Sequence, residues 1–139
     1  MAEALLDANV LVYAMSDAAG ERAKREEARR LLETVDYGTS YQVLMETWVA
    51  ATRKMKIPVA EEKVLAFLER VAAQPVAHGT PELWRAAVRL AARYGVHPYD
   101  AAILAAAKEL GAAIVYSEDM ADGQDYDGVK VINPFRQPS

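Results

Sequence analysis

The sequence contains no cysteine, and this absence excludes several classes of site. A chain without thiols forms no disulfide, binds no zinc through thiolates and performs no thiol-based catalysis. Its two histidines, His78 and His97, are too few and too far apart in the sequence to predict a histidine metal site. Oxygen ligands therefore remain as the candidates for any metal chemistry.

Long apolar runs are also missing. No apolar segment reaches the ~20 residues that span a bilayer, and Glu3 stands where a signal peptide has basic residues. The sequence shows no linker-like stretch, low-complexity tract or internal repeat. With 139 residues, 53% hydrophobic and 26% charged, the chain is expected to form one cytoplasmic domain, residues 1–139. Its net charge of −4 gives no sign of nucleic-acid binding, although a local basic patch is compatible with it.

Short apolar strands alternate with amphipathic helices along the chain. Strands are expected at 4–6, 37–40, 75–77, 113–117 and 129–132. Helices are expected at 21–35, 41–55, 60–73, 80–95 and 98–111. This alternation favours an α/β fold in which helices flank a central parallel sheet of about five strands.

Three isolated carboxylates lie in three separate apolar segments. Asp7 lies within ALLDANVLVYAM, Glu46 within YQVLMETWVAA and Asp100 within YDAAILAAA. A buried carboxylate requires a cation, a hydrogen-bond network or access to solvent. No Lys or Arg stands alone in a comparable segment to neutralise them. Asp7 follows an expected strand, and Asp100 lies in the first turn of an expected helix, where the helix dipole favours an anion.

A fourth acid, Asp119, follows the expected strand 113–117 by two residues. Ligands of open parallel sheets gather beyond the carboxyl ends of the strands, so Asp119 would reach the same edge as Asp7. Two charges ~4 Å apart repel by roughly 4 kcal/mol at an effective dielectric of ~20. If the four acids converge, they would take up protons or bind a multivalent cation, with Mg²⁺ or Mn²⁺ favoured over zinc. Such a site suits metal-dependent phosphodiester hydrolysis.

Four segments, in this order, resemble the PIN-domain ribonucleases, and most closely the VapC-type toxins of prokaryotic toxin–antitoxin pairs. They are LLDANVLVYA, SYQVLMETW, HPYDAAILAAAKELGAAIVYSEDMADGQ and YDGVKVINPF. The resemblance runs from end to end and implies a single PIN-like domain with helices on both sides of the sheet. It also implies an enzyme that cuts single-stranded RNA with Mg²⁺ or Mn²⁺.

The resemblance further assigns roles to particular residues and partners. It identifies Asp7, Glu46, Asp100 and Asp119 as the catalytic, metal-binding acids, and Asn9 and Ser117 as polar residues that support them. It implies a homodimer that is inhibited by a small, partly disordered antitoxin, which brings a basic side chain to the acids.

Two features depart from the family pattern. Ala8 stands where a hydroxyl-bearing residue is usual. The last turn is crowded with acids, namely Glu118, Asp119, Asp122, Asp125 and Asp127. Asp119 fits the motif best, and Asp122 is the second candidate.

Each acid also has a purely structural interpretation. Asp7 and Asp100 are possible helix caps, Glu46 is a possible solvent-facing residue and Asp119 a possible turn residue.

Competing functions are a phospho-acceptor aspartate domain of the receiver or phosphatase type, an inactive PIN-like scaffold, and an RNA-processing nuclease without an antitoxin. Such phosphatases usually carry a second Asp where this chain has Asn9. PIN-like scaffolds tend to lose acids, and all four are present here.

Two surfaces are candidates for macromolecular contacts. For RNA, Arg85, Arg89 and Arg93 recur every four residues with no acid between them. Residues 22–30 are also rich in Lys and Arg, but interleaved acids supply salt-bridge partners there. For the antitoxin, a groove is expected on two helices that carry more apolar surface than a core of this size needs. Its residues are Leu31, Leu32, Leu65 and Leu68.

Overall fold

In the computed structural model, which describes residues 1–136, strands and helices alternate along the chain. They are β1 (Ala4–Leu6), α1 (Ala8–Met15), η1 (Ala19–Glu21), α2 (Arg22–Thr34), β2 (Tyr37–Ser40), α3 (Tyr41–Val49), η2 (Ala50–Lys54), α4 (Glu61–Ala72), β3 (Val76–Ala77), α5 (Pro81–Tyr94), α6 (Pro98–Glu109), β4 (Ile114–Tyr116), β5 (Asp125–Tyr126) and β6 (Val129–Ile132). The predicted strands and helices are confirmed, with small shifts at their ends. Within the described residues, no helix combines the length and apolar character that crossing a membrane requires.

Across residues 1–136, the strands form one six-stranded sheet in the order β3-β2-β1-β4-β6-β5. Neighbours from β3 to β6 pair in parallel, as predicted. The additional strand, β5, was not predicted and pairs antiparallel with β6. Asp127 and Gly128 join the two strands with φ of 53° and 93°. Positive φ at both positions is the geometry of the tight hairpin turn that an Asp-Gly pair favours.

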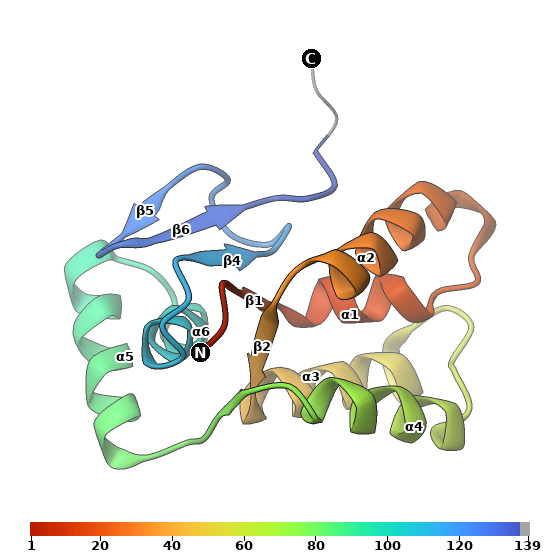
Figure 1. Cartoon of the computed structure of the whole chain (residues 1–139), viewed down its shortest axis with the longest axis horizontal. Helices are drawn as coiled ribbons and strands as arrows, with labels where there is room; N and C mark the ends of the chain where they lie inside the picture. The colour runs from red at the N-terminus through yellow and green to blue at the C-terminus, as the bar shows by residue number, and fades with distance from the viewer. Residues whose placement is uncertain (137–139) are drawn as a thin grey trace.

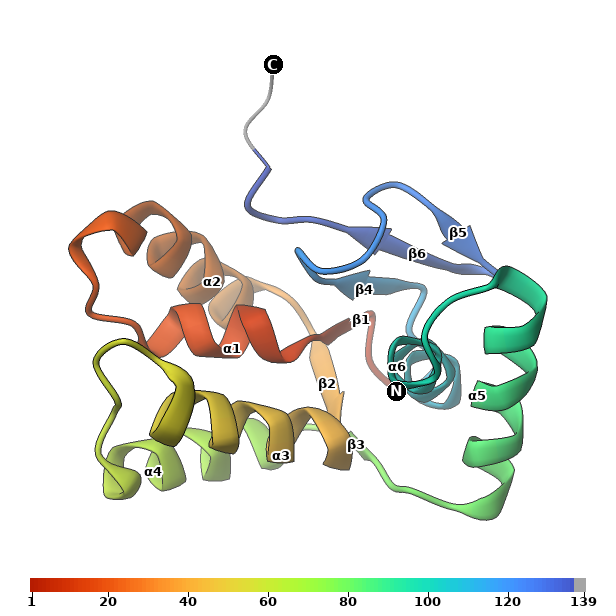
Figure 2. The same cartoon turned by 180° about the vertical axis from the view of Figure 1, so that it is seen from behind.

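The direction of the crossovers explains why helices cover both faces of the sheet. The chain steps from β1 to β2 to β3 and then returns past β1 to form β4. Because parallel crossovers are right-handed, this reversal places α5 and α6 opposite to α1 through α4. Figures 1 and 2 show α5 and α6 together on one flank and α1 through α4 on the other. The predicted α/β architecture is confirmed.

The apolar run after Asp7 forms helix α1, which the sequence analysis did not predict. Asp7 is extended (φ −76°, ψ 164°) and caps the helix, because its Oδ1 accepts a 2.7 Å hydrogen bond from the Ala8 N–H. Val10, Leu11 and Ala14 form the buried side of α1. The strand therefore ends, and the helix begins, at the one charged residue of this segment.

Helix α3 ends in a π-helical turn, η2, in place of continuing as a regular helix. The N–H of Met55 donates a 3.0 Å hydrogen bond to the Ala50 carbonyl, five residues earlier. Ala51 anchors this turn from the inside, since it packs with Val64 and Leu68 of α4 in a small apolar cluster separate from the main core. Single π-turns are rare and frequently mark functional sites.

Candidate active site

The candidate site lies where the chain leaves β1 and β4 at the centre of the sheet. These strands are parallel neighbours with Leu6 beside Tyr116, and the Asp7 N–H donates a 3.1 Å hydrogen bond to the Tyr116 carbonyl. The chain continues from β1 into α1 on one side of the sheet, while β4 is reached through α6 on the other side. This is the topological switch point, where open α/β sheets bind their ligands.

Asp7 is the buried acid of this edge, with 5% of its surface exposed. Besides the Ala8 N–H, its carboxylate accepts a 2.8 Å hydrogen bond from the Ser117 hydroxyl. Burial raises the pKa of Asp7 from 3.8 to about 6, and the charges of Glu46 and Asp119 add to this increase. The hydrogen bonds from Ser117 and Ala8 oppose it, because they favour the ionised form.

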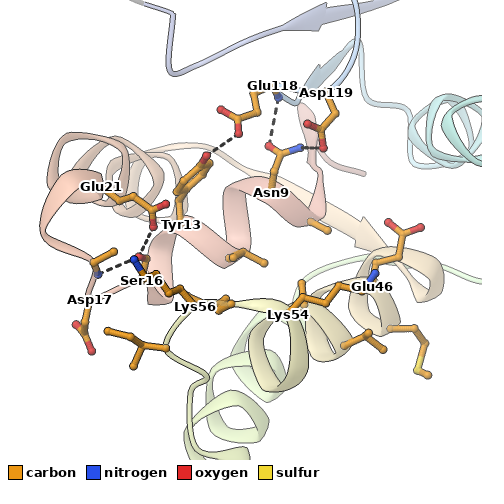
Figure 3. A pocket seen from close by; sticks show the side chains of 18 of the residues that line it. Asn9, Tyr13, Ser16, Asp17, Glu21, Glu46, Lys54, Lys56, Glu118 and Asp119 are labelled. Atoms are coloured by element: carbon orange, nitrogen blue, oxygen red, sulfur yellow. Dashed lines mark hydrogen bonds between the residues drawn. The ribbon is translucent and has the colours of Figure 1, made fainter.

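Asn9 connects the ends of β1 and β4 through its amide. Its Nδ2 donates 3.1 Å hydrogen bonds to the Ser117 hydroxyl and to Asp119 Oδ2, and its Oδ1 accepts from the Glu118 N–H at 3.2 Å. The N–H of Asp119 donates to the same Ser117 hydroxyl at 3.1 Å. Figure 3 shows Asn9 between Glu118 and Asp119. Four sequence-predicted residues, Asp7, Asn9, Ser117 and Asp119, thus belong to one hydrogen-bond network.

Glu46 and Asp100 approach this network from α3 and α6. Glu46 is exposed and accepts a 3.0 Å hydrogen bond from Gln42, and its charge contributes to the raised pKa of Asp7. Asp100 is half-buried, and its pKa is raised by burial in the first place and also by the charge of Asp119. His97 opposes that increase. Charge interactions therefore link Asp7 to Glu46 and to Asp119, and Asp119 to Asp100. Within residues 1–136, however, no three carboxylate or histidine groups are close enough to hold a metal ion together.

The other acids of the last turn have different partners. Asp122 accepts a 2.8 Å hydrogen bond from the Asn133 N–H and pairs with Arg136 at 2.9 Å, and both lower its pKa. Asp125 and Asp127 sit at the β5–β6 hairpin, where Asp125 accepts from the Gly128 N–H and Asp127 pairs with basic side chains. Of Asp119, Asp122, Asp125 and Asp127, only Asp119 is hydrogen-bonded to Asn9. The structure therefore places Asp119 beside Asp7, whereas Asp122 lies elsewhere.

Glu118 is a feature that the sequence analysis did not single out. Its carboxylate accepts hydrogen bonds from the Tyr13 hydroxyl at 2.6 Å and from Lys24 Nζ at 3.0 Å. Lys24 Nζ also lies 4.7 Å from the centroid of the Tyr13 ring. These contacts tie the loop after β4 to α1 and α2. No local pattern reports them, because Glu118 is 105 and 94 positions away from Tyr13 and Lys24 in the sequence.

An open pocket of about 840 Å³ adjoins the acids. Asn9, Glu46, Glu118 and Asp119 line it together with Tyr99, which is 68% exposed. Its wall also includes Lys54 and Lys56, from η2 and the following loop, which the sequence analysis did not select. Their signal in the sequence was the basic run TRKMK, which lies in η2 and the loop after it.

The predicted arginine stripe lies away from this pocket. Arg85, Arg89 and Arg93 are exposed on α5, which packs on α6 at the outer flank of the molecule (Figure 1). Arg93 lies 3.5 Å from Asp127, an acid that the spacing within the helix did not reveal. None of the three arginines lines the pocket beside the acids, and a role in RNA binding remains a prediction.

The predicted partner groove is only partly exposed. Leu31 and Leu68 are 1% and 8% exposed and pack inside the molecule, so the inclusion of these two side chains in an open groove was wrong. Leu31 belongs to the main core, and Leu68 packs with Ala51 and Val64. Leu32 is half-buried and lines a cleft between α2 and α4, whereas Leu65 is 53% exposed. Of the four leucines predicted for the groove, only Leu32 and Leu65 are thus accessible to a partner.

Comparison with known proteins gives both a family and a fold. The chain matches the family model of the PIN domain over residues 4–121. No curated protein matches it significantly. Similar solved structures include a toxin–antitoxin complex from Klebsiella pneumoniae, with a TM-score of 0.69, 20% identity, and coverage of 96% of this chain and 99% of that chain.

Two further structures have comparable similarity. VapC20 from Mycobacterium tuberculosis, a sarcin-ricin loop cleaving toxin, has a TM-score of 0.65 and 21% identity over 84% of this chain and 89% of that chain. DNA-bound VapBC from Salmonella typhimurium has a TM-score of 0.65 and 24% identity over 94% of this chain and 97% of that chain. At these identities, the similarity establishes a shared fold.

Proposed function

The chain belongs to the PIN-domain family, and from this premise we propose that it is an Mg²⁺- or Mn²⁺-dependent endonuclease that cuts single-stranded RNA. The observation that carries the proposal is the buried Asp7 carboxylate at the switch point of the sheet, hydrogen-bonded to Ser117 and repelled by the charges of Glu46 and Asp119. Fixed negative charges around an open pocket favour a divalent cation, which removes their mutual repulsion.

The donor set fits a hard cation. Asp7, Glu46, Asp100 and Asp119 supply oxygen ligands only, and Mg²⁺ prefers few carboxylates and retains water, so it does not require three of them in direct contact. These four acids would hold the ion. When bound, such an ion neutralises charge on a phosphoryl group and makes water a better nucleophile at neutral pH.

The remaining polar side chains orient the acids. The Ala8 N–H and the Ser117 hydroxyl fix the two oxygens of Asp7, and Asn9 fixes Asp119. Gln42 fixes Glu46 from one turn earlier on α3 and also donates to the Tyr99 carbonyl at 3.2 Å. Preorganised carboxylates lose little freedom when a cation and a phosphodiester arrive, which supports a catalytic role for the network.

We further propose that the chain, as a single PIN domain over residues 1–139, is the toxin of a type II toxin–antitoxin pair. The solved structures that share its fold include a toxin–antitoxin complex and a toxin that cleaves the sarcin-ricin loop. The expected biology is a cytoplasmic homodimer inhibited by a small cognate antitoxin. The alternative is an RNA-processing PIN nuclease without an antitoxin. A reading frame for a small DNA-binding protein immediately upstream would favour the toxin.

The test is cleavage of labelled single-stranded RNA in Mg²⁺, in Mn²⁺ and in EDTA. Cleavage in either metal and its loss in EDTA are expected. Asp7→Asn and Asp100→Asn should each lower the rate by at least ~100-fold, whereas Glu109→Gln, at the far end of α6, should retain the wild-type rate. Wild-type protein that cuts no RNA in either metal would exclude the nuclease, and cutting by Asp7→Asn at the wild-type rate would exclude that residue.

A further inference from the structure

The pocket beside the acids has a basic side as well as an acidic one. Lys54 and Lys56 line the same cavity as Asn9, Glu46 and Asp119. Figure 3 shows the two lysines across the pocket from Asn9 and Asp119 in that view. Both lysines are exposed, and neither lies within salt-bridge distance of a carboxylate among residues 1–136.

The π-turn explains why these positions face the pocket. Ala51 is fully buried and fixes the inner side of η2, and the Val59 N–H donates a 2.9 Å hydrogen bond to the Ala51 carbonyl. This bond folds the loop 55–58 back onto the end of α3. A π-turn inserts one residue relative to a regular helix and so rotates the residues that follow. Lys54 thus reaches the pocket wall, while its neighbour Arg53 does not line it.

Among residues 1–136, Lys54 and Lys56 are the cations that line this pocket, and neither forms a salt bridge there. Five acids line the cavity, namely Asp17, Glu21, Glu46, Glu118 and Asp119. Glu21 accepts a hydrogen bond from Ser16, and Glu118 is paired with Lys24. A polyanionic strand that approaches Asp119 and Glu46 meets repulsion, which nearby ammonium groups offset. Lys54 and Lys56 carry the positive charge at the wall where such a strand would continue.

We propose that Lys54 and Lys56 bind backbone phosphates of the single-stranded RNA next to the bond that is cut. The inference rests on the proposed nuclease function and adds a substrate-binding residue pair to it. Ammonium groups contact phosphate independently of sequence, so the pair positions the strand and leaves base choice to other residues. The two lysines act on substrate binding, and the acids act on the chemical step.

Steady-state cleavage of a labelled RNA by the double variant Lys54→Ala/Lys56→Ala tests this. KM should rise roughly tenfold with kcat within about twofold of wild type. The slope of log affinity against log salt should become shallower by about 1.4, since each lost single-strand contact contributes ~0.7. Lys54→Arg/Lys56→Arg should restore most of the binding, because a phosphate contact requires only a positive charge.

The matched control is Arg53→Ala/Lys63→Ala, which removes the same net charge from exposed positions of η2 and α4 outside this pocket. It should leave KM and the salt slope near wild type. Fluorescence anisotropy of an RNA oligonucleotide in EDTA gives the same comparison without cleavage, so the lysines remain testable if the protein proves not to be a nuclease. Equal affinity and salt slope in wild type and Lys54→Ala/Lys56→Ala would overturn the inference, as would a loss confined to kcat.

Discussion

The hydroxyl of Ser117 donates a 2.8 Å hydrogen bond to Asp7, a residue 110 positions earlier in the chain. Both side chains are buried, at 0% and 5% exposure. Burial disfavours the Asp7 charge, whereas this hydrogen bond favours it. The bond therefore holds the pKa of Asp7 lower than burial alone would set it, and it joins the two strands at the centre of the candidate site.

Replacement of Ser117 by alanine should raise the pKa of Asp7 further. With the donor removed, protonated Asp7 persists to higher pH, so the acidic limb of the pH–rate profile should move to higher pH. The loss of activity should accordingly be larger at pH 6 than at pH 8. Ser40→Ala is the matched control, since Ser40 is also buried at a strand end but caps α3 through Val43. A profile that shifts equally in both variants would contradict the assignment of the effect to Asp7.

Asp7→Asn should change how stability depends on pH in the absence of metal. The carboxyl ionises near 3.8 when the chain is unfolded and near 6 when it is folded, so the folded protein binds more protons in between. The Asp7 carboxyl therefore favours the folded state of the wild-type protein fully below pH 4. As the pH rises through 6, the free energy of unfolding falls by up to roughly 3 kcal/mol, because the charged form is disfavoured in the folded state. Asparagine carries no charge and avoids this loss.

Urea unfolding of both proteins in EDTA measures the effect. The stability of Asp7→Asn relative to wild type should increase between pH 4 and pH 7 and remain constant above that. A difference between the two proteins that is the same at both pH values would show that Asp7 ionises normally in the folded state.

The sequence predicted the elements that follow regular patterns, and the reasons are local. Helix α5 begins at the Thr80 cap with Pro81 and ends at Gly95, whose φ of 66° suits glycine. Helix α1 was not predicted, because Val10, Leu11 and Val12 are apolar in succession and read equally well as strand. Asp7 is still extended and bonded to Tyr116 of β4, and the helix begins after it because its carboxylate caps the Ala8 N–H.

The candidate site was predictable to a similar extent. Isolated carboxylates in apolar segments singled out Asp7 and Asp100, because a charge among apolar residues is unusual at any position. Lys54 and Glu118 stand among other charged residues and carry no such signal. Their positions became visible only when η2 and the loop after β4 were placed around one pocket.

Asp119 and Asp122 should separate cleanly by mutation. Asp119→Asn keeps the shape of the side chain but removes a charge beside Asp7, and the cleavage rate should fall by ~100-fold or more. Asp122→Asn should retain activity, because Asp122 is bonded to the Asn133 N–H and to Arg136. It should instead lower the thermal midpoint above pH 4, where the ionised form with its lowered pKa contributes stability. Rates that fall equally in both variants would remove the distinction.

Leu65 tests the proposed antitoxin surface without disturbing the core. Because its side chain is 53% exposed, Leu65→Glu should change the free energy of unfolding by less than ~0.5 kcal/mol. Inhibition by the product of the adjacent reading frame should weaken at least ~tenfold, since the charge would be desolvated on binding. Val88→Glu, at a 46% exposed position of α5 on the opposite flank, is the control and should be inhibited normally. Equal inhibition of both variants would place the antitoxin elsewhere.

The ends of the cleaved RNA distinguish the two chemistries open to a ribonuclease. An acid cluster that holds a divalent cation suits attack by water on phosphorus, and this route does not use the 2′-hydroxyl. The products should then carry 5′-phosphate and 3′-hydroxyl ends, and an RNA with a 2′-deoxy or 2′-O-methyl group at the cleavage position should still be cut. Attack by the 2′-hydroxyl would leave a 2′,3′-cyclic phosphate, which mass spectrometry detects directly. That reaction needs a general base and acid near neutral pKa but no set of four carboxylates, so a cyclic end would argue against the role assigned to Glu46, Asp100 and Asp119.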